Sequence, residues 1–549
     1  MKRYVQREFR FDTSESETLR MDESSHRGNR ETSEVPSGDH LPRGRSDKAE
    51  GRTADMHAAE ESDDLVVPTK QANNANEVML RVAAESVEGR GSAKGNEERS
   101  QSDRTQSRIH RSWGLLGVRL AAEKDRKLCF TNLMHHLTLE LFTVAFFDLK
   151  KNAAPGVDDV TWHEYLQDYQ LRLQDLHARV HSGRYQAQPS RRQWIPKANG
   201  GQRPLGIAAL EDKIVQSAMV TLLSQIYEVD FNGFSYGSRP GKSQHNALDA
   251  VSVGLQQRKV NWILDADLQG FFDNISHEEL LKALRVRIGD RRVLGLIQKW
   301  LTAGVSEEGE WSPTTVGTPQ GAVISPLLAN VFLHYILDQW INNWRRQCRG
   351  DVIIVRYADD FVMGFQSYLE AERCLRELRE RLALYGLTLH PEKTRLIEFG
   401  RFAAPQRQQR GESQPETFAF LGFTHYCGTT RKGWFKVGRL PLAKRMRTKL
   451  GEIKRNLRRR MHAPVAKTGQ WLRSVVRGWL NYYAVPGTSH VIDQFVTEVE
   501  RMWAKMLRRR SQRGRRAWPW SRINKLTRHW IPRAQIVHPY PNQRLCVKT

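Results

Sequence analysis

The sequence predicts an α+β protein, and three features of the chain support this fold class. Two strand-length apolar runs, Val352–Val355 and Phe361–Met363, flank a pair of aspartates. Longer segments, such as Asp212–Tyr227, carry apolar residues at the three-to-four spacing of a helix. The first 110 residues are polar and contain few aromatic side chains. We therefore expect a core of strands and helices that follows a disordered tail, residues 1–110.

The charge of the chain is distributed unevenly. The chain has 549 residues and a formal net charge of +25, but residues 1–110 contain 18 Lys and Arg against 22 Asp and Glu. Residues 431–549 contain 30 Lys and Arg against 4 Asp and Glu, together with seven of the 15 tryptophans. A basic segment rich in aromatic residues favours a nucleic-acid partner, and an ordinary solvated basic surface is the alternative.

Several function classes are excluded by what the sequence lacks. The five cysteines form no Cys-x-x-Cys pair, which argues against a disulfide framework or a zinc ribbon. The first residues lack the apolar core of a signal peptide, and no run of about 18 apolar residues is present, so we expect a cytoplasmic protein without a membrane partner. The glycine-rich loop Phe231–Ser243 lacks the spacing of a P-loop, which argues against an NTPase.

The first elements of the predicted core are a helix and a hairpin. Leu128–Lys150 carries apolar residues at helical spacing. Gln193–Ile207 reads as a hairpin in which Lys197 and Arg203 flank an Asn-Gly-Gly turn from opposite strands. Two cations on such a hairpin suit the phosphates of a triphosphate, and two exposed surface charges are the alternative.

Acidic residues then mark two predicted strands. Asp265 and Asp267 alternate with apolar residues in Val260–Leu268, so both side chains point to one face. Asp359 and Asp360 lie at the turn of the second hairpin, where two adjacent buried acids cost several kcal/mol unless a cation neutralises them. Carboxylates from two strands suit two Mg²⁺ ions about 3.5–4 Å apart, the arrangement used for in-line phosphoryl transfer.

The segments around the second hairpin continue the α+β pattern. A Gly/Pro loop from Val316 opens an apolar helix that extends to about Trp340, and Leu369–Leu384 has helical spacing. Gly386–Thr394 is expected to form a strand and a turn, and Phe418–Thr424 a short hairpin.

The basic end of the chain carries three helix patterns, Leu442–Met461, Leu472–Tyr483 and Ile492–Met506. The first has an apolar stripe and an opposite cationic face that we expect to contact RNA phosphates. This cationic face consists of Lys444, Arg445, Lys449, Arg455, Arg458 and Arg459. Beyond the three helices, Arg513–Thr549 mixes aromatic and basic residues, which suits charge contacts combined with base stacking.

Seven motifs along the chain resemble those of bacterial group II intron reverse transcriptase/maturases. They are Ala154–Asp158, Arg203–Ile207, Asp267–Asp273, Gly317–Gly321, Tyr357–Asp360, Phe420–Phe423 and Arg477–Tyr483, in the order of the family. The resemblance covers about residues 125–549. It implies a right-hand polymerase with fingers, an antiparallel-sheet palm, and an α-helical thumb that doubles as a maturase domain. The corresponding boundaries are an N-terminal extension and fingers over 111–255, a palm over 256–430, a thumb over 431–507, and a basic DNA-binding segment over 508–549.

The resemblance also implies roles for individual residues. Asp267, Asp359 and Asp360 would be catalytic and would hold two Mg²⁺ ions, with the carbonyl of Leu268 as a further ligand. The residues matched to the dNTP site are Lys197, Arg203, Phe272, Gln320 and Lys393, and among them Phe272 is the aromatic gate against a ribose 2′-hydroxyl. The residues matched to the primer grip are Phe420, Leu421, Gly422 and Phe423. Asp265 and Asp273 are left outside this set, because we expect Asp273 to cap the helix that begins near Ser276.

The implied function is an RNA-directed DNA polymerase that copies intron RNA into cDNA and assists the splicing of its own group II intron. Its partners would be the intron RNA, a DNA target and primer, and dNTPs. The chain ends at Thr549 without the endonuclease module that some members append, so another source of primer is expected. Two alternatives stay open: a maturase without polymerase activity, and a retron-like or defence-associated bacterial reverse transcriptase. The intact set of aspartates argues against the first, and the Arg477–Tyr483 motif argues against the second.

Overall fold

A computed structural model of the chain describes residues 66–68, 114–196 and 201–547. Most of the expected tail therefore lies outside the described residues. Within it, β1 (Val66–Pro68) pairs antiparallel with β13 (Leu545–Val547). A partner strand 477 or more residues away satisfies the backbone groups of β1, and no local pattern predicts such a pairing.

The first described elements form a helical layer. Residues 114–124 are helical, and η3 (Met134–His136), α2 (Leu139–Asp148), α3 (Trp162–Gln167) and α4 (Tyr169–His181) follow. The helix expected over Leu128–Lys150 begins only at Leu139, where the side chain of Thr138 accepts a hydrogen bond from the amide of Leu141. Upstream, Asp290 accepts hydrogen bonds from the amides of Leu133 and Met134, so tertiary bonds replace the helical ones there.

The hairpin expected over Gln193–Ile207 is confirmed as β2 (Ser190–Pro196) and β3 (Gln202–Ile207), which we call the charged hairpin. Lys197 lies in its turn, outside the described residues. The hairpin extends into a four-stranded sheet in the order β3-β2-β5-β6, where β5 (Val305–Glu307) pairs parallel to β2 and β6 (Glu310–Ser312) completes the edge.

Six further helices connect and cover the sheets. They are α5 (Leu210–Asp230), α6 (Gln244–Gln257), α7 (His277–Arg285), α8 (Arg291–Thr302), α9 (Ser325–Leu333) and α10 (Gln339–Arg345). A π-helical turn, η5 (His334–Asp338), joins α9 to α10, so this helical run continues beyond the expected end at Trp340. The expected role of Asp273 is wrong, because Ser276 caps α7 through a hydrogen bond from the amide of Glu279 and Asp273 is exposed.

A four-stranded antiparallel sheet lies at the centre of the described fold, in the order β7-β8-β4-β9. Its strands are β4 (Trp262–Ala266), β7 (Val352–Tyr357), β8 (Asp360–Phe365) and β9 (Arg395–Glu398). We call β7 and β8 the acidic hairpin. Gly386–Thr394 forms only a single bridge, from Leu389 to Leu268, rather than the expected strand.

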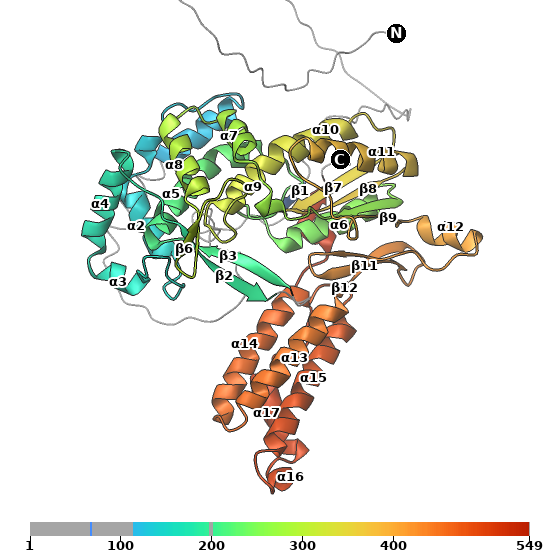
Figure 1. Ribbon diagram of the computed structural model, residues 1–549. Helices are drawn as coiled ribbons and strands as arrows, with labels where there is room; N and C mark the ends of the chain where they lie inside the picture. Colours follow the sequence, from blue (N-terminus) through green and yellow to red (C-terminus); the bar gives the residue numbers. More distant parts are fainter. Residues whose placement is uncertain (1–65, 69–113, 197–200, 548–549) are drawn as a thin grey trace, which may run out of the picture. The chain divides into compact units, whose positions relative to one another are not determined.

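The two faces of this sheet pack into two separate cores. On β4, Leu264 belongs to one core and its neighbour Ile263 to the other, and on β7 Ile354 and Val355 divide in the same way. This is the alternation that a strand imposes on successive side chains. Helix α11 (Tyr368–Ala383) covers one face and α6 covers the other, as Figure 1 shows.

The second core continues through a small sheet into the basic helices. The sheet has the order β10-β11-β12, with β10 (Phe418–Phe420), β11 (Phe423–Thr429) and β12 (Phe435–Pro441), and α12 (Ala403–Gln409) precedes it. The three expected helices are confirmed as α13 (Ala443–Arg459), α14 (Val465–Tyr483) and α15 (Ser489–Arg508). The remaining helices are η4 (Phe271–Asp273), α16 (Gly514–Ala517), α17 (Trp520–Trp530) and α18 (Pro541–Arg544).

The α+β composition is therefore confirmed. Across the described residues, none of the helices is both long enough and apolar enough to span a bilayer.

Candidate active site

The register of the central sheet brings the acidic residues of two strands to one edge. Asp360 is the first residue of β8 and pairs with Tyr357, so Asp359 lies in the turn of the acidic hairpin. Ala266 of β4 pairs with Phe361 of β8. Because the strands are antiparallel, Asp267, one residue beyond Ala266, lies opposite Asp360.

The electrostatics of this edge are those of crowded carboxylates. Partial desolvation, together with the charges of Asp359, Asp267 and Asp265, raises the pKa of Asp360 to about 7, although its side chain keeps a solvent-exposed surface. Burial also raises the pKa of Asp359, with a contribution from Asp267, whereas Arg203 and Arg356 oppose the rise. Desolvation, together with the repulsion between these carboxylates, therefore opposes the ionisation of Asp359 and Asp360.

Two cations from the segment after α11 contact the acids on β4. The ammonium of Lys393 contacts the carboxylate of Asp267, and a guanidinium nitrogen of Arg395 lies 3.7 Å from Asp265. Burial raises the pKa of Asp265 to about 6, with Arg395 opposing the rise. The amide of His390 donates to the carbonyl of Asp267 at 2.8 Å, which ties the Lys393 turn to the end of β4.

Phe272 lies five residues beyond Asp267, in η4, and is partly buried. Its ring meets Phe271 edge-on, with 5.3 Å between the ring centroids. Its carbonyl accepts a hydrogen bond from the amide of Thr318 at 2.8 Å. Gly317 has a positive φ of 89°, and a Cβ there would lie 2.9 Å from the carbonyl oxygens of Phe272 and Asp273. Only glycine permits this approach of the loop that carries Gln320.

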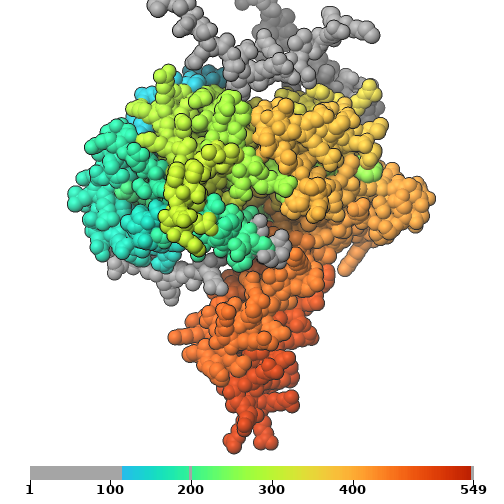
Figure 2. Space-filling view, in the orientation of Figure 1, coloured from blue at the N-terminus to red at the C-terminus, as the bar shows by residue number. Residues whose placement is uncertain are grey.

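The same loop is also bonded to the charged hairpin. The amide of Gly206 on β3 donates to the carbonyl of Gln320 at 2.6 Å. Gly321 has a φ of 111°, and a Cβ there would lie 2.7 Å from the carbonyl of Gly206. Figure 2 shows the surfaces of the charged hairpin and of residues 305–321 side by side. Gln320 thus lies between Phe272 and the strand of Arg203.

The turn between β10 and β11 has the backbone of a tight hairpin. Leu421 and Gly422 both have positive φ, 45° and 81°, as a two-residue type I′ turn requires. The hydroxyl of Tyr482 on α14 donates to the carbonyl of Leu421 at 2.7 Å. Phe420 and Phe423 are buried, and the ring of Phe423 contacts Tyr482 and Tyr483. The hydrogen bond and the ring contacts from α14 therefore fix the position of the turn.

Comparison with known proteins identifies the family. A model described as reverse transcriptase (RNA-dependent DNA polymerase) matches residues 195–425, which include β3 of the charged hairpin, the acidic hairpin and the Phe420–Phe423 turn. Protein YkfC of Escherichia coli (strain K12) is 36% identical over 278 residues, which are 44% of this chain and 72% of that protein. The chain belongs to the reverse transcriptase family.

Intron-encoded proteins are among the relatives of this reverse transcriptase. Group II intron-encoded protein LtrA of Lactococcus lactis subsp. cremoris is 35% identical over 217 residues, 39% of this chain and 35% of that protein. The putative COX1/OXI3 intron 2 protein of Saccharomyces cerevisiae is 35% identical over 279 residues, 51% of this chain and 30% of that protein. The chain thus spans about a third of the length of these two relatives. The resemblance to group II intron reverse transcriptases is confirmed.

The six cationic residues expected to bind RNA all lie on α13 of the reverse transcriptase, but they do not share one environment. Arg455, Arg458 and Arg459 are exposed on the second half of the helix. Lys449 pairs with Glu452 at 3.1 Å, and Lys444 is exposed. Arg445 differs, because a Cβ at Gly422 would lie 2.8 Å from its Nη1 and because its charge lowers the pKa of Asp360.

The donors at the acidic edge fit magnesium. In the described ranges, no group of three or more His, Cys, Asp or Glu side chains is arranged to enclose a metal. Mg²⁺ keeps several waters and takes only a few carboxylates plus substrate phosphates, so a closed protein cage is not required. The raised pKa values of Asp359 and Asp360 indicate charge that a bound cation would neutralise.

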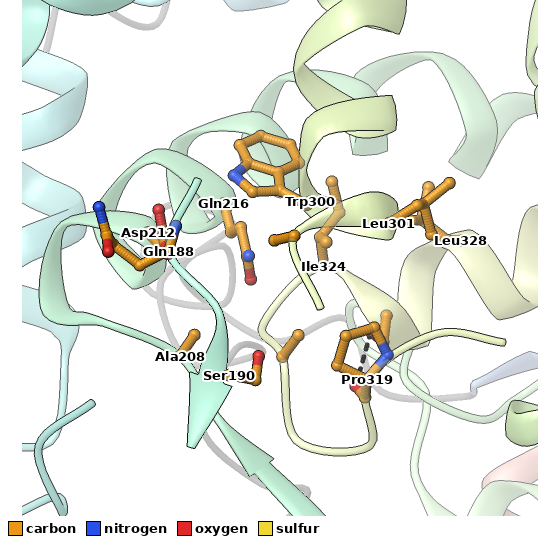
Figure 3. Close-up of a pocket in the computed structure, with 13 residues that line it drawn as sticks. Gln188, Ser190, Ala208, Asp212, Gln216, Trp300, Leu301, Pro319, Ile324 and Leu328 are labelled. Atoms are coloured by element: carbon orange, nitrogen blue, oxygen red, sulfur yellow. Dashed lines mark hydrogen bonds between the residues drawn. The ribbon is translucent and has the colours of Figure 1, made fainter. Parts of the chain in front are cut away.

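A small cavity lies behind the charged hairpin, lined by α5, β2 and the Gln320 loop (Figure 3). On one side, Trp300 donates to the hydroxyl of Tyr185 at 2.9 Å, and this hydroxyl donates to the carboxylate of Asp212. On the other, the amide of Val323 donates to the side chain of Gln216 at 3.0 Å. The bond to Gln216 ties the Gln320 loop to α5, and the bonds of Tyr185 tie α8 to α5, so we interpret the cavity region as a support of the site.

Sequence reasoning missed two participants. Arg445 was assigned to RNA binding with its neighbours, and only the packing of α13 against the Phe420–Phe423 turn distinguishes it. No role was assigned to Arg356 from the sequence. The signal for Arg356 was an arginine inside an otherwise apolar strand, a position at which a charge requires buried partners.

Proposed function

We propose that this reverse transcriptase copies RNA into DNA by two-metal phosphoryl transfer and assists the splicing of the group II intron that encodes it. The observation that carries the proposal is the convergence of Asp267, Asp359 and Asp360 on one sheet edge, with raised pKa values for the last two. Placing several carboxylates close together in a partly buried site destabilises the fold, and such clusters with raised pKa values occur mainly at functional sites.

The polymerase site that we propose uses these acids as ligands. Asp267, Asp359, Asp360 and the carbonyl of Leu268 would hold two Mg²⁺ ions, which would neutralise charge on the transferred phosphate and activate the primer hydroxyl. Lys393, which contacts Asp267, would also reach the triphosphate. Arg203, whose charge acts on Asp359, would also bind the triphosphate.

The remaining contacts would select and align the substrates. Phe272 would lie against the 2′ position of the sugar, and Gln320 would line the nucleotide and template pocket. The Phe420–Phe423 turn would hold the primer end. Lys197, the other proposed triphosphate ligand, lies outside the described residues.

The division of the chain that we propose follows the right-hand polymerase. Fingers over 111–255 would carry the charged hairpin, and a palm over 256–430 the acids. A thumb over 431–507 would bind the intron RNA through α13 as well as the primer duplex, and 508–549 would contact DNA. The high positive charge of residues 431–549 supports these last two roles.

Primer extension on an RNA template tests the polymerase site. Asp359→Asn and Asp267→Asn should each lower the extension rate by about a thousandfold or more, because each removes a charge that holds Mg²⁺ at the reacting phosphate. Asp273→Asn is the matched control, since Asp273 is exposed and follows the same strand, and it should extend primers nearly as the parent does. Extension by either site variant at the rate of the parent would refute the assignment.

A further inference from the structure

The turn that presents Asp359 has a conformation that its own residues do not favour. Ala358 has a positive φ of 55°, a left-handed conformation that is unfavourable for a residue with a side chain. The turn packs against residues 234–237 so closely that a Cβ at Gly237 would lie 2.2 Å from the amide nitrogen of Ala358. Something in the surrounding structure must therefore hold the turn in place.

Arg356 bonds this turn and the segment against which the turn packs. Its backbone bonds to the 234–237 segment on both sides, donating to the carbonyl of Phe234 at 2.9 Å and accepting from the amide of Tyr236 at 2.8 Å. Its side chain is fully buried, and its Nη1 donates to the carbonyl of Ala358 at 2.9 Å. The guanidinium thus bonds the strained residue directly.

Two helical residues orient this guanidinium. Asp338 accepts from Nε at 2.7 Å and from Nη2 at 2.5 Å, a bidentate pair in which both side chains are about 1% exposed. Asn330 accepts from Nη1 at 2.9 Å, and its amide donates to the carbonyl of Gly237 at 2.7 Å. Arg356, Ala358, Gly237 and Asn330 therefore form a closed ring of contacts, with Asp338 as the charge partner.

The π-helical turn η5 gives both helical residues access to Arg356. Asn330 and Asp338 are eight residues apart, which in a regular α-helix would rotate their side chains about 80° from each other. The wider turn of His334–Asp338 removes most of this difference and brings both side chains to the same face. Such π-turns inside α-helices are frequent at functional sites.

We propose that Arg356, Asp338 and Asn330 are positioning residues that hold the Ala358–Asp359 turn so that Asp359 and Asp360 meet the metal ions in register with Asp267. This inference rests on the proposed polymerase function. A buried ion pair contributes little to stability compared with apolar residues of similar size, so a conformational role explains its presence better than a stabilising one.

The chain offers a matched control. Arg287 and Asp230 form another buried pair, with Nε to Oδ2 at 2.9 Å and side chains 1% and 8% exposed, and Arg287 bonds the carbonyls of Asp125 and Leu128 rather than the acidic hairpin. Asp338→Asn and Asp230→Asn therefore each remove the acid of a buried ion pair, and only the first pair reaches the turn.

The test combines thermal unfolding, amide hydrogen exchange and metal dependence. Both variants should lower Tm, because each leaves a buried arginine without its charge partner. Only Asp338→Asn should speed exchange of the amides of residues 357–360, by about tenfold or more, and raise the Mg²⁺ concentration for half-maximal primer extension by a similar factor. Arg356→Lys is a second variant for the case that Asp338→Asn does not fold. It keeps the buried charge but removes the guanidinium that bonds both Asp338 and Ala358, so it should have the same two effects.

Two results would overturn the positioning role. One is that Asp338→Asn and Arg356→Lys leave both the amide exchange rates of residues 357–360 and the Mg²⁺ dependence of extension unchanged. The other is that Asp230→Asn changes both quantities as much as they do. Hydrogen exchange needs no polymerase activity. If the parent protein extends no primer, the proposed function fails, while the exchange comparison still decides whether these residues hold the turn.

Discussion

At the scale of single residues, Phe272 is the side chain that we propose selects the sugar of the incoming nucleotide. Its ring is partly buried against Phe271 and its carbonyl bonds the Gln320 loop, so its position is well defined. An aromatic ring that lies against C2′ of the sugar would clash with a 2′-hydroxyl.

Phe272→Ala should therefore raise incorporation of ribonucleotides relative to dNTPs by about tenfold or more, the factor that corresponds to the loss of roughly 1.4 kcal/mol of discrimination. The measurement is the ratio of kcat/KM for an rNTP and the matching dNTP in the variant and the parent. An unchanged ratio would place the gate elsewhere.

Asp212, beneath the charged hairpin, makes a second residue-scale prediction. Burial raises the pKa of this carboxyl to about 6, against about 3.9 in an unfolded chain. The folded state therefore holds a proton that the unfolded state releases between these values. Its contribution to stability is complete below about pH 4 and is lost as the pH rises through about 6.

Relative to Asp212→Asn, which does not titrate, the parent should lose about 2 kcal/mol of unfolding free energy between about pH 4 and pH 7. Thermal unfolding of the two proteins across this range gives the difference. A constant difference in Tm would show that Asp212 titrates alike in the folded and unfolded states.

At the scale of elements, the two ends of α13 lie in different surroundings. Its first turn carries Arg445, which lies against the Phe420–Phe423 turn and lowers the pKa of Asp360. Its second half carries Arg455, Arg458 and Arg459, all exposed. A test of RNA binding should therefore change the second half alone and leave Arg445 in place.

Changing Arg455, Arg458 and Arg459 together to Ala should weaken intron-RNA binding and flatten its salt dependence. Each lost phosphate contact lowers the slope of log K against log salt by roughly 0.7, so three lower it by roughly 2. The measurement is a titration of intron RNA at several salt concentrations. The control is Arg376→Ala with Arg379→Ala, two exposed cations on α11, which should keep the parent slope. Equal slopes for the triple variant and the parent would argue against phosphate contacts on α13.

At the scale of the whole molecule, the central sheet joins two cores that serve different proposed tasks. One core holds the acidic edge from the side of α5 and α11, and the other runs through β10–β12 into α13, α14 and α15. Because the acids and the exposed arginines of α13 belong to different surfaces, polymerisation and RNA binding should be separable.

Asp359→Asn should abolish primer extension and keep intron-RNA binding and splicing assistance within about twofold of the parent, since only one charge at the sheet edge changes. Parallel splicing and extension assays on the same preparation measure both activities. Loss of splicing as deep as the loss of extension would mean that the acids also serve the RNA-binding surface.

Local patterns in the sequence were sufficient for much of the fold. The alternation in Val260–Leu268 placed Asp265 and Asp267 on one face, and the apolar runs around Asp359 predicted the acidic hairpin. The three C-terminal helices followed from stripes of apolar residues. These features depend on the period of a strand or a helix, which is a property of neighbouring residues.

The remaining features depend on residues that are distant in the sequence. The contact of Lys393 with Asp267, the approach of Arg445 to Gly422, and the pairing of Arg356 with Asp338 each join separate elements. Sheet register and the rotation of packed helices decide such contacts, and neither is encoded in a local period. The π-turn before Asp338 shows the reason most directly, because one widened helical turn, invisible in the spacing of apolar residues, determines which side chain reaches the buried arginine.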